Sequence, residues 1–430
     1  MLCNTPIYLF RSFTSNDYVK HSFINFCALS TAKGMVVIMK NIKKLMALIL
    51  ATMISLLVFT GCSNNGTTLY NAINKTQKIQ SDITLNISTD NLSMQEQQVM
   101  QTIIPLVNAS KLSVVTYTNQ DENNAVSQMK SDIKFTEPTS FDMSLWTNMD
   151  TTKDKPVVSE IFKMPDVLTK QLPNEFKGKD YMVMDYNDMG NVQEASQVDY
   201  KKLAEFSKEF QPKFLQFMAN YAKQFNPKFN IISKIGTKNI NDSTSTQSVS
   251  IYQVKLDDKT FKDLIHYTLN NFAENRDAIA FLKDYMTNLN SIMGLSENQE
   301  DLNKTFDEMP EMIAQLNKKL ATLDNVKILG DKGITIQYTV SHDGYVVNET
   351  GNAEFVINLP ELSKLSQDNV SPQQQNSQKP TGIYTIDLNF NNRYYAINGY
   401  NPITFPALTE YNSFNYIDLL KIISKQSNSK

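Results

Sequence analysis

The chain has 430 residues, of which 41% are hydrophobic and 20% charged, proportions typical of a folded protein that exclude a disordered one. Six of its 41 basic and one of its 44 acidic residues lie in residues 1–61, which leaves 35 basic and 43 acidic residues and a formal charge of −8 beyond them. A mildly acidic domain has no electrostatic attraction to nucleic acid, so we expect no such partner.

A targeting segment is predicted over residues 39–61. Three lysines precede an uncharged run from Leu45 to Thr60. Gly61 and Cys62 follow this run. A basic region followed by an apolar one is the layout of a secretory signal peptide. The run is slightly shorter than the roughly 20 apolar residues that a membrane-spanning helix needs.

The end of this run, Val58-Phe59-Thr60-Gly61-Cys62, resembles the lipobox of bacterial lipoproteins, although Phe59 stands where leucine is usual. The resemblance implies that diacylglycerol is joined to the sulfur of Cys62, that the chain is cut after Gly61, and that residues 62–68 form a polar tether. Two acyl chains, at about 0.8 kcal/mol per buried CH₂, give stable attachment. We therefore expect a protein anchored to the cell membrane by the lipid on Cys62, on its extracytoplasmic face.

The alternative interpretation of this segment is an uncleaved signal anchor with an incidental cysteine. Residues 1–38 do not fit a signal peptide, so we expect translation to start at Met39 or Met35. Of the three cysteines only Cys62 would remain after cleavage, so no intramolecular disulfide is expected.

Residues 69–197 are predicted to form a first α+β half. A short helix from Leu69 to Ile79 leads into an alternating strand around residues 83–87, and a helix from Leu92 to Val107 follows. Further strands are predicted at 112–117, 126–135, 141–146, 157–162 and 181–186.

Residues 198–425 are predicted to form a second α+β half. Apolar residues at steps of three and four predict a helix over 198–226, with Pro212 indicating two helices or a kink. This stripe is strongly aromatic, and it either packs the helix on the sheet or lines a cavity for an apolar ligand. Its candidate ligand-binding residues are Phe206, Phe210, Phe214 and Phe217.

The remainder of this half alternates between strands and helices. Strands are predicted at 229–235, 249–256, 334–340, 345–347, 355–359, 383–390 and 393–397. Helices are predicted after a cap at Asp257 or Asp258, and at 277–293, 302–323 and 416–423, with Pro310 dividing the third. Asp343-Gly344 is a hairpin turn, and the polar residues 367–381 predict a loop.

Segregated blocks of strands and helices predict an α+β fold with large curved antiparallel sheets and helices packed on one face. The recurrence of helix followed by strands raises the hypothesis of two similar halves. The element order, with an opening helix leading into strands over Asn71 to Ile87, resembles the LolA/LppX-like envelope lipoproteins and carriers. That resemblance implies a half-open curved sheet that holds a lipid against its helices, and it assigns no lipid-contacting residue.

Catalytic signatures are missing from the exported part. Its two histidines, His266 and His342, have no second histidine or cysteine at a metal-ligand spacing, and there is no phosphate-binding glycine loop or nucleophile elbow. We therefore expect no enzyme, no catalytic residue, no metal site and no cofactor.

The leading functional hypothesis is a non-enzymatic lipoprotein that binds an apolar or amphipathic ligand such as a lipid. The alternative is an envelope structural or interaction protein without a small-molecule site, whose protein partner the sequence does not identify. A hydrolase built on carboxylates is a third hypothesis, and no pair of acidic residues is singled out for it.

Attachment of lipid at Cys62 is directly testable. Cells expressing the chain should incorporate labelled palmitate into it, and Cys62→Ala should abolish the label because the acceptor sulfur is gone. Ser63→Ala, which changes the residue beside the acceptor cysteine but keeps its sulfur, should leave labelling unchanged. Label that persists in Cys62→Ala would contradict the assignment.

Overall fold

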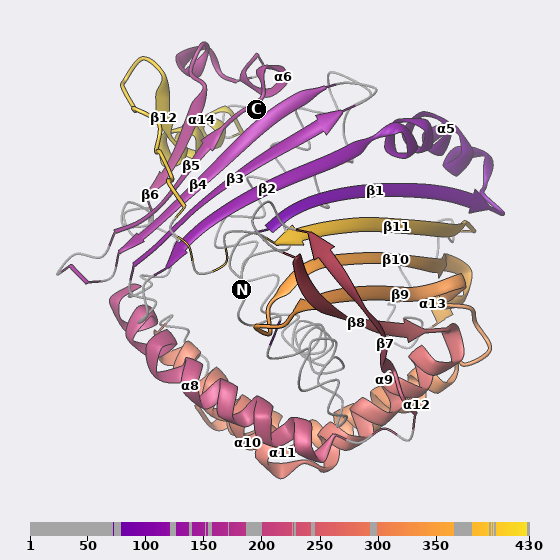
Figure 1. The fold of residues 1–430 in the computed structure, drawn as a ribbon. Helices are drawn as coiled ribbons and strands as arrows, with labels where there is room; N and C mark the ends of the chain where they lie inside the picture. Colours follow the sequence, from indigo (N-terminus) through magenta and orange to yellow (C-terminus); the bar gives the residue numbers. More distant parts are fainter. Residues whose placement is uncertain are drawn as a thin grey trace.

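A computed structural model describes residues 72, 79–120, 126–136, 140–150, 152–153, 157–170, 172–185, 200–225, 227, 229–241, 246–292, 299–364, 381–394, 397, 399 and 401–427. The described part is an α+β fold, as the sequence predicts, in which all described strands join one curved 12-stranded sheet. An arc of helices, α8 to α12, faces the concave side of this sheet (Figure 1).

The described strands are β1 (Ile79–Asp90), β2 (Lys111–Gln120), β3 (Val126–Thr136), β4 (Phe141–Asp150), β5 (Val157–Lys163), β6 (Tyr181–Asp185), β7 (Ile232–Asn241), β8 (Thr246–Leu256), β9 (Leu329–Ser341), β10 (Val346–Asn358), β11 (Ile383–Tyr394) and β12 (Ser413–Asn415). The described helices are α5 (Met94–Ala109), α6 (Asp166–Thr169), η3 (Asn174–Phe176), α8 (Tyr200–Gln224), α9 (Asp258–Glu274), α10 (Arg276–Ile292), α11 (Gln299–Asp307), α12 (Met309–Ala321), α13 (Leu359–Lys364) and α14 (Tyr416–Ser427).

The strand order is β12-β6-β5-β4-β3-β2-β1-β11-β10-β9-β8-β7. Neighbours are antiparallel except for β12, which runs parallel to β6. Strands β1 to β6 come from the predicted first half and β7 to β11 from the second. The two sets meet where β1 pairs with β11, from Ile79 opposite Tyr394 to Asp90 opposite Ile383.

The alternation of side chains gives the sheet an inner and an outer face. One face carries Tyr252, Tyr338 and Val340, which belong to a hydrophobic core shared with α9 to α12. We call this face the inner face. Directly opposed residues point to the same face, so the register extends this face across the neighbouring strands. The main core lies between β8, β9 and the helices, and it includes the buried Leu264 and Phe306.

A segment after β11 crosses the outer face of the sheet and ends at its far edge. Asn401 is buried there, accepting from the Asn119 amide through its carbonyl at 2.6 Å and donating its N–H to Asn119 Oδ1 at 2.9 Å. The indole N–H of Trp146 donates to the carbonyl of Thr404 at 3.0 Å. Residues 401–412, which we call the strap, thereby connect the sheet's middle to β12 at its edge.

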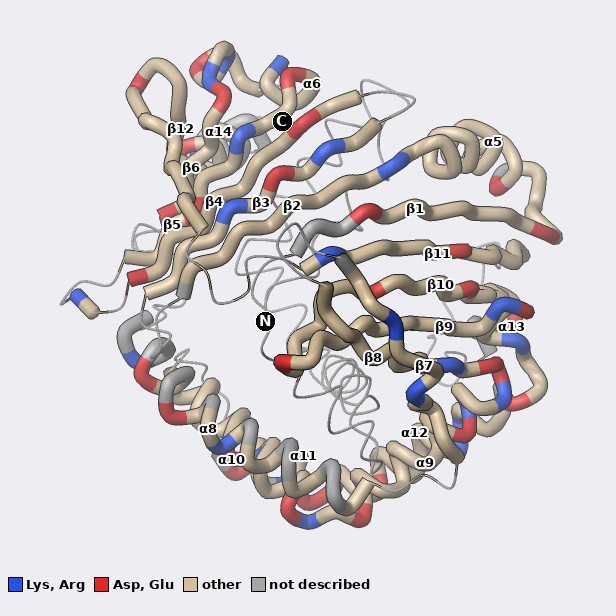
Figure 2. The backbone as a smooth tube through the Cα atoms, in the orientation of Figure 1, with Lys and Arg blue, Asp and Glu red and all other residues tan. Residues whose placement is uncertain are grey.

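Helix boundaries follow the predicted local chemistry. Asp257 caps α9 by accepting the N–H of Thr260, and Pro310 lies in the first turn of α12, where its missing N–H does no harm. Acidic and basic residues are interspersed along the helices (Figure 2). Of the two alternatives predicted at Pro212, two separate helices are excluded, because a single helix, α8, runs through it, whereas the kink stays a prediction.

Three strand predictions are corrected. Two predicted strands, 345–347 and 355–359, fall on the single strand β10, apart from Tyr345 before it and Leu359 at the start of α13. The predicted strand 383–390 and the first two residues of 393–397 fall on the single strand β11, and residues 395 and 396 lie outside the described part. Polar residues separate the apolar ones in both strands, so the apolar pattern breaks while backbone pairing continues. Strand β7 begins at Ile232, later than predicted. The predicted helix 69–79 and most of the loop 367–381 lie outside the described residues.

Gly333 provides a test of the β9 backbone. Its φ is +60°, and a Cβ atom there would lie 2.2 Å from the carbonyl oxygen of Leu256. Gly333→Ala should therefore lower the free energy of unfolding by about 1–3 kcal/mol. Gly236→Ala, at a β7 bulge where a Cβ would meet no atom within 4 Å, is the matched control. Urea unfolding followed by the fluorescence of Trp146 measures both, and equal midpoints would contradict the assignment.

Candidate functional site

An apolar row crosses the inner face of the sheet from β8 to β4. The register places these residues opposite one another: Val254, Ile336, Gly351, Phe390, Ile83, Leu112, Phe135 and Phe141. Val254 is fully buried in the core, whereas every residue from Ile336 onward is only half-buried. The apolar face thus extends well beyond the core that the helices α9 to α12 cover.

Aromatic rings give this row its local shape. The ring of Phe390 lies across the neighbouring strand at Gly351, where a Cβ atom would come within 2.2 Å of Phe390 Cζ. Phe135 and Phe141 stack with their ring centroids 4.4 Å apart. Glycine at position 351 therefore lets an aromatic ring lie flat along the inner face.

A polar cluster lies beside the apolar row on the inner face, two residues farther along each strand. Glu349 of β10 is directly opposite Tyr338 of β9 and Asn392 of β11, so all three point to the inner face. Glu349 Oε2 accepts the hydroxyl of Tyr394 at 2.8 Å and the Asn392 amide at 2.9 Å. We call these four residues the Glu349 cluster.

The two tyrosines of the cluster stay protonated. Burial, and then the negative charge of Glu349 and hydrogen bonding to it, raises the pKa of Tyr338 and that of Tyr394 far above the ordinary value. Both phenols can therefore act as hydrogen-bond donors at any physiological pH, and Glu349 acts as an acceptor.

The structure brings the four predicted phenylalanines together on one side of α8. Phe210 lies 4.7 Å from Tyr285 of α10, and Phe217 stacks on Phe281 at 4.3 Å, measured between ring centroids. Phe206 and Phe214 belong to the same seam, and all four are half-buried. Their contacts join α8 to α10, and their role in ligand binding remains a prediction.

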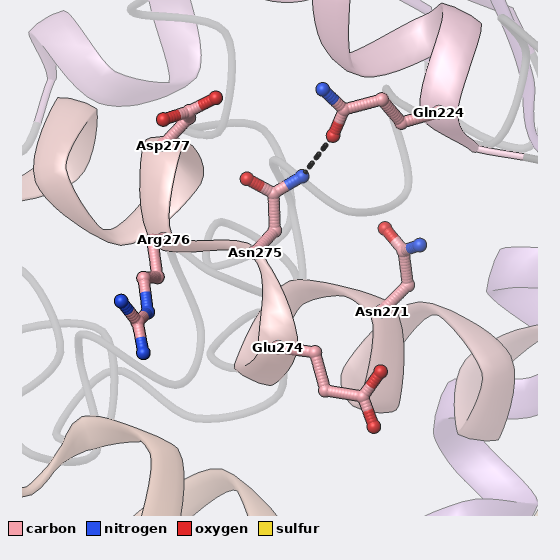
Figure 3. A pocket seen from close by; sticks show the side chains of 6 residues that line it. All are labelled: Gln224, Asn271, Glu274, Asn275, Arg276 and Asp277. Atoms are coloured by element: carbon pink, nitrogen blue, oxygen red, sulfur yellow. Dashed lines mark hydrogen bonds between the residues drawn. The ribbon is translucent and has the colours of Figure 1, made fainter.

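Two hollows lie elsewhere on the described surface. The first, of about 360 Å³, is at the junction of α8, α9 and α10 (Figure 3). It is lined by Gln224, Asn271, Glu274, Asn275, Arg276 and Asp277. Its Asn275 is engaged in structure, since its amide donates to Gln224 and its carbonyl oxygen accepts from Ala278 N–H at the start of α10. The second, of about 410 Å³, lies between residues 89–92 and α5.

His266 connects α9 to α12. Its Nδ1 contacts Asn317 Oδ1, and its Nε2 lies 2.9 Å from Asp324 Oδ1. Burial alone would lower the pKa of His266, but the hydrogen bonds to Asn317 and Asp324 and the charge of Asp324 outweigh it and raise the pKa above its usual value. His342 is exposed in the turn between β9 and β10. Among the described residues, no three His, Cys, Asp or Glu side chains gather to hold a metal.

The predicted lipidation site, Cys62, and the predicted cleavage site, Gly61, lie outside the described residues. None of the described helices combines the length and apolarity that spanning a membrane requires. Comparison with protein-family models, with curated proteins and with solved structures finds no match to this chain.

Sequence reasoning missed the Glu349 cluster, although one signal could have found it. In β10 the apolar residues Ala353, Phe355 and Ile357 occupy odd positions. Extending this phase back along the strand places Glu349 on the same face. A charged residue in phase with apolar ones indicates a polar group on an otherwise apolar surface.

His266 generates a pH prediction. Because its folded pKa is raised, the stabilisation it provides is complete below the unfolded pKa of about 6.5 and is lost as pH rises through the folded value. His266→Gln should therefore lower the urea midpoint more at about pH 5.5 than at about pH 8.5. His342→Gln, which removes the exposed histidine, is the control. A deficit in His266→Gln that is independent of pH would refute this role.

Proposed function

We propose that this chain is a lipid-anchored protein of the extracytoplasmic membrane face that binds an amphipathic ligand, with no catalytic step, by laying its acyl chain on the inner face of the sheet. The observation that supports binding is the half-buried apolar row from Ile336 to Phe141. Apolar side chains in such a position gain free energy when a hydrocarbon replaces the water that reaches them.

The dimensions of the row suit a single acyl chain. Adjacent strands are about 4.8 Å apart, so the six steps from Ile336 on β9 to Phe141 on β4 span about 29 Å. The hydrocarbon of one bilayer leaflet is about 15 Å thick, half of the roughly 30 Å core. Each CH₂ that leaves water contributes about 0.8 kcal/mol, so a chain of ordinary length has enough contact to bind.

In this proposal the lipid anchor keeps the binding face close to the membrane that supplies the ligand. Two acyl chains on Cys62 would hold the domain beside a membrane that is itself a source of amphipathic molecules. The resemblance of the element order to the LolA/LppX-like group supports the same function. Mass spectrometry under native conditions should detect a small molecule that dissociates on denaturation, while the lipid on Cys62 stays covalently attached.

An interaction protein without a small-molecule site is the second candidate. The observation in its favour is the exposure of apolar side chains on the strap, where Tyr411 is 81% and Leu408 38% exposed. Crosslinking in intact cells that yields a reproducible protein partner, together with no bound small molecule, would favour it over the ligand-binding proposal.

Two adjacent valines of β2 offer a matched test. Val114 points to the inner face and Val115 to the outer face, and both are half-buried. Val114→Asn should weaken binding of a fluorescent fatty acid about tenfold, because an amide would be desolvated against hydrocarbon. Val115→Asn should leave the affinity unchanged. Equal effects of the two substitutions would contradict binding on the inner face.

A further inference from the structure

The position of Glu349 is unusual for a carboxylate. It points to the same face as the apolar row and as the core tyrosines, and it is half-buried. Taking a carboxylate out of water is costly unless a partner charge or several hydrogen bonds compensate for the lost hydration. Tyr394 and Asn392 provide two such bonds, which orient the group without neutralising its charge.

On the outer face of the same strands, two acidic residues form ion pairs with a lysine. Glu354 of β10 and Asp387 of β11 both meet the ammonium group of Lys332, with Glu354 Oε2 at 3.8 Å from Lys332 Nζ. In the described part of the chain, no lysine, arginine or histidine forms an ion pair with Glu349. The inner face therefore presents an oriented negative charge whose counterion the described residues do not supply.

The surroundings of Glu349 fit one class of cation. A primary ammonium carries three N–H donors, which carboxylate and phenol oxygens can accept. Gly351 and Phe390, in the apolar row, are two positions along their strands from Glu349 and Asn392, about 7 Å away.

We propose that the Glu349 cluster binds the primary ammonium head of an amphipathic ligand whose chain lies along the apolar row. This inference rests on the proposed function, since it assigns the head group of the same ligand. The chain and the head are then recognised by adjacent parts of one face. The apolar row supplies affinity for any acyl chain, and Glu349 supplies the preference among head groups.

The test compares two probes with the same chain, dodecylamine and dodecanol, as competitors of a bound fluorescent fatty acid at pH 7. The full chain should bind dodecylamine about tenfold more tightly, the difference expected for a charge-assisted hydrogen bond. Glu349→Gln should abolish this preference and leave the affinity for dodecanol unchanged. Glu354→Gln, on the same strand but the outer face, should keep the preference.

Each outcome is informative about one of the two proposals. Equal binding of both probes to the unsubstituted chain, or a preference that persists in Glu349→Gln, overturns the head-group assignment and leaves acyl-chain binding intact. Failure of both probes to bind overturns the proposed function itself. If circular dichroism shows that Glu349→Gln does not fold, Tyr394→Phe replaces it, because it removes one hydroxyl of the cluster and keeps the ring. Its preference should fall by a few-fold, and an unchanged preference would count against the site.

Discussion

Side chains of an antiparallel sheet alternate between two faces, and here neighbouring strands keep their phase from β8 to β4. A shift of one residue in any strand would move its isoleucines and phenylalanines to the outer face. The helices, the core and the apolar row all depend on this common phase. A hydrophobic core forms where α9 to α12 pack on the inner face of β8 and β9. Farther along the sheet, the apolar side chains of this face are only half-buried.

The two faces of the sheet differ in how their polar side chains are paired. On the outer face, Asn352 donates to Asp387 and Asn389, and Lys332 meets two acidic residues, so polar side chains satisfy one another. On the inner face Glu349 lies beside the apolar row, and the Tyr394 hydroxyl and the Asn392 amide orient its carboxylate. A surface that carries a negative charge beside an apolar row is complementary to an amphipathic molecule, which is why we favour such a ligand over a purely apolar one.

Most strands and helices could be predicted because the spacing of apolar residues along a short segment differs between the two kinds of element. The cap at Asp257, the turn at Gly344 and the division at Pro310 were all readable from a few residues. The pairing of β1 with β11 was not, since no local pattern names a distant partner. The strap has no hydrophobic periodicity, and its contacts with Asn119 and Trp146 join residues more than 250 positions apart, which no local pattern can predict. For the site, the phenylalanine stripe was found as a helix face, whereas its partners Phe281 and Tyr285 depend on how two helices pack.

The pairing of β1 with β11 has a consequence for how the chain folds. Ile79 must find Tyr394, so the centre of the sheet closes only when nearly the whole chain is available. Until then β1 is an edge strand, with a row of unpaired backbone N–H and C=O groups that can add a strand from another molecule. Contacts of such sequence separation slow folding and lengthen exposure to aggregation. The middle of this sheet therefore cannot close before residues 383–394 are available, and a chain interrupted before β11 would expose the unpaired backbone groups of β1 to solvent.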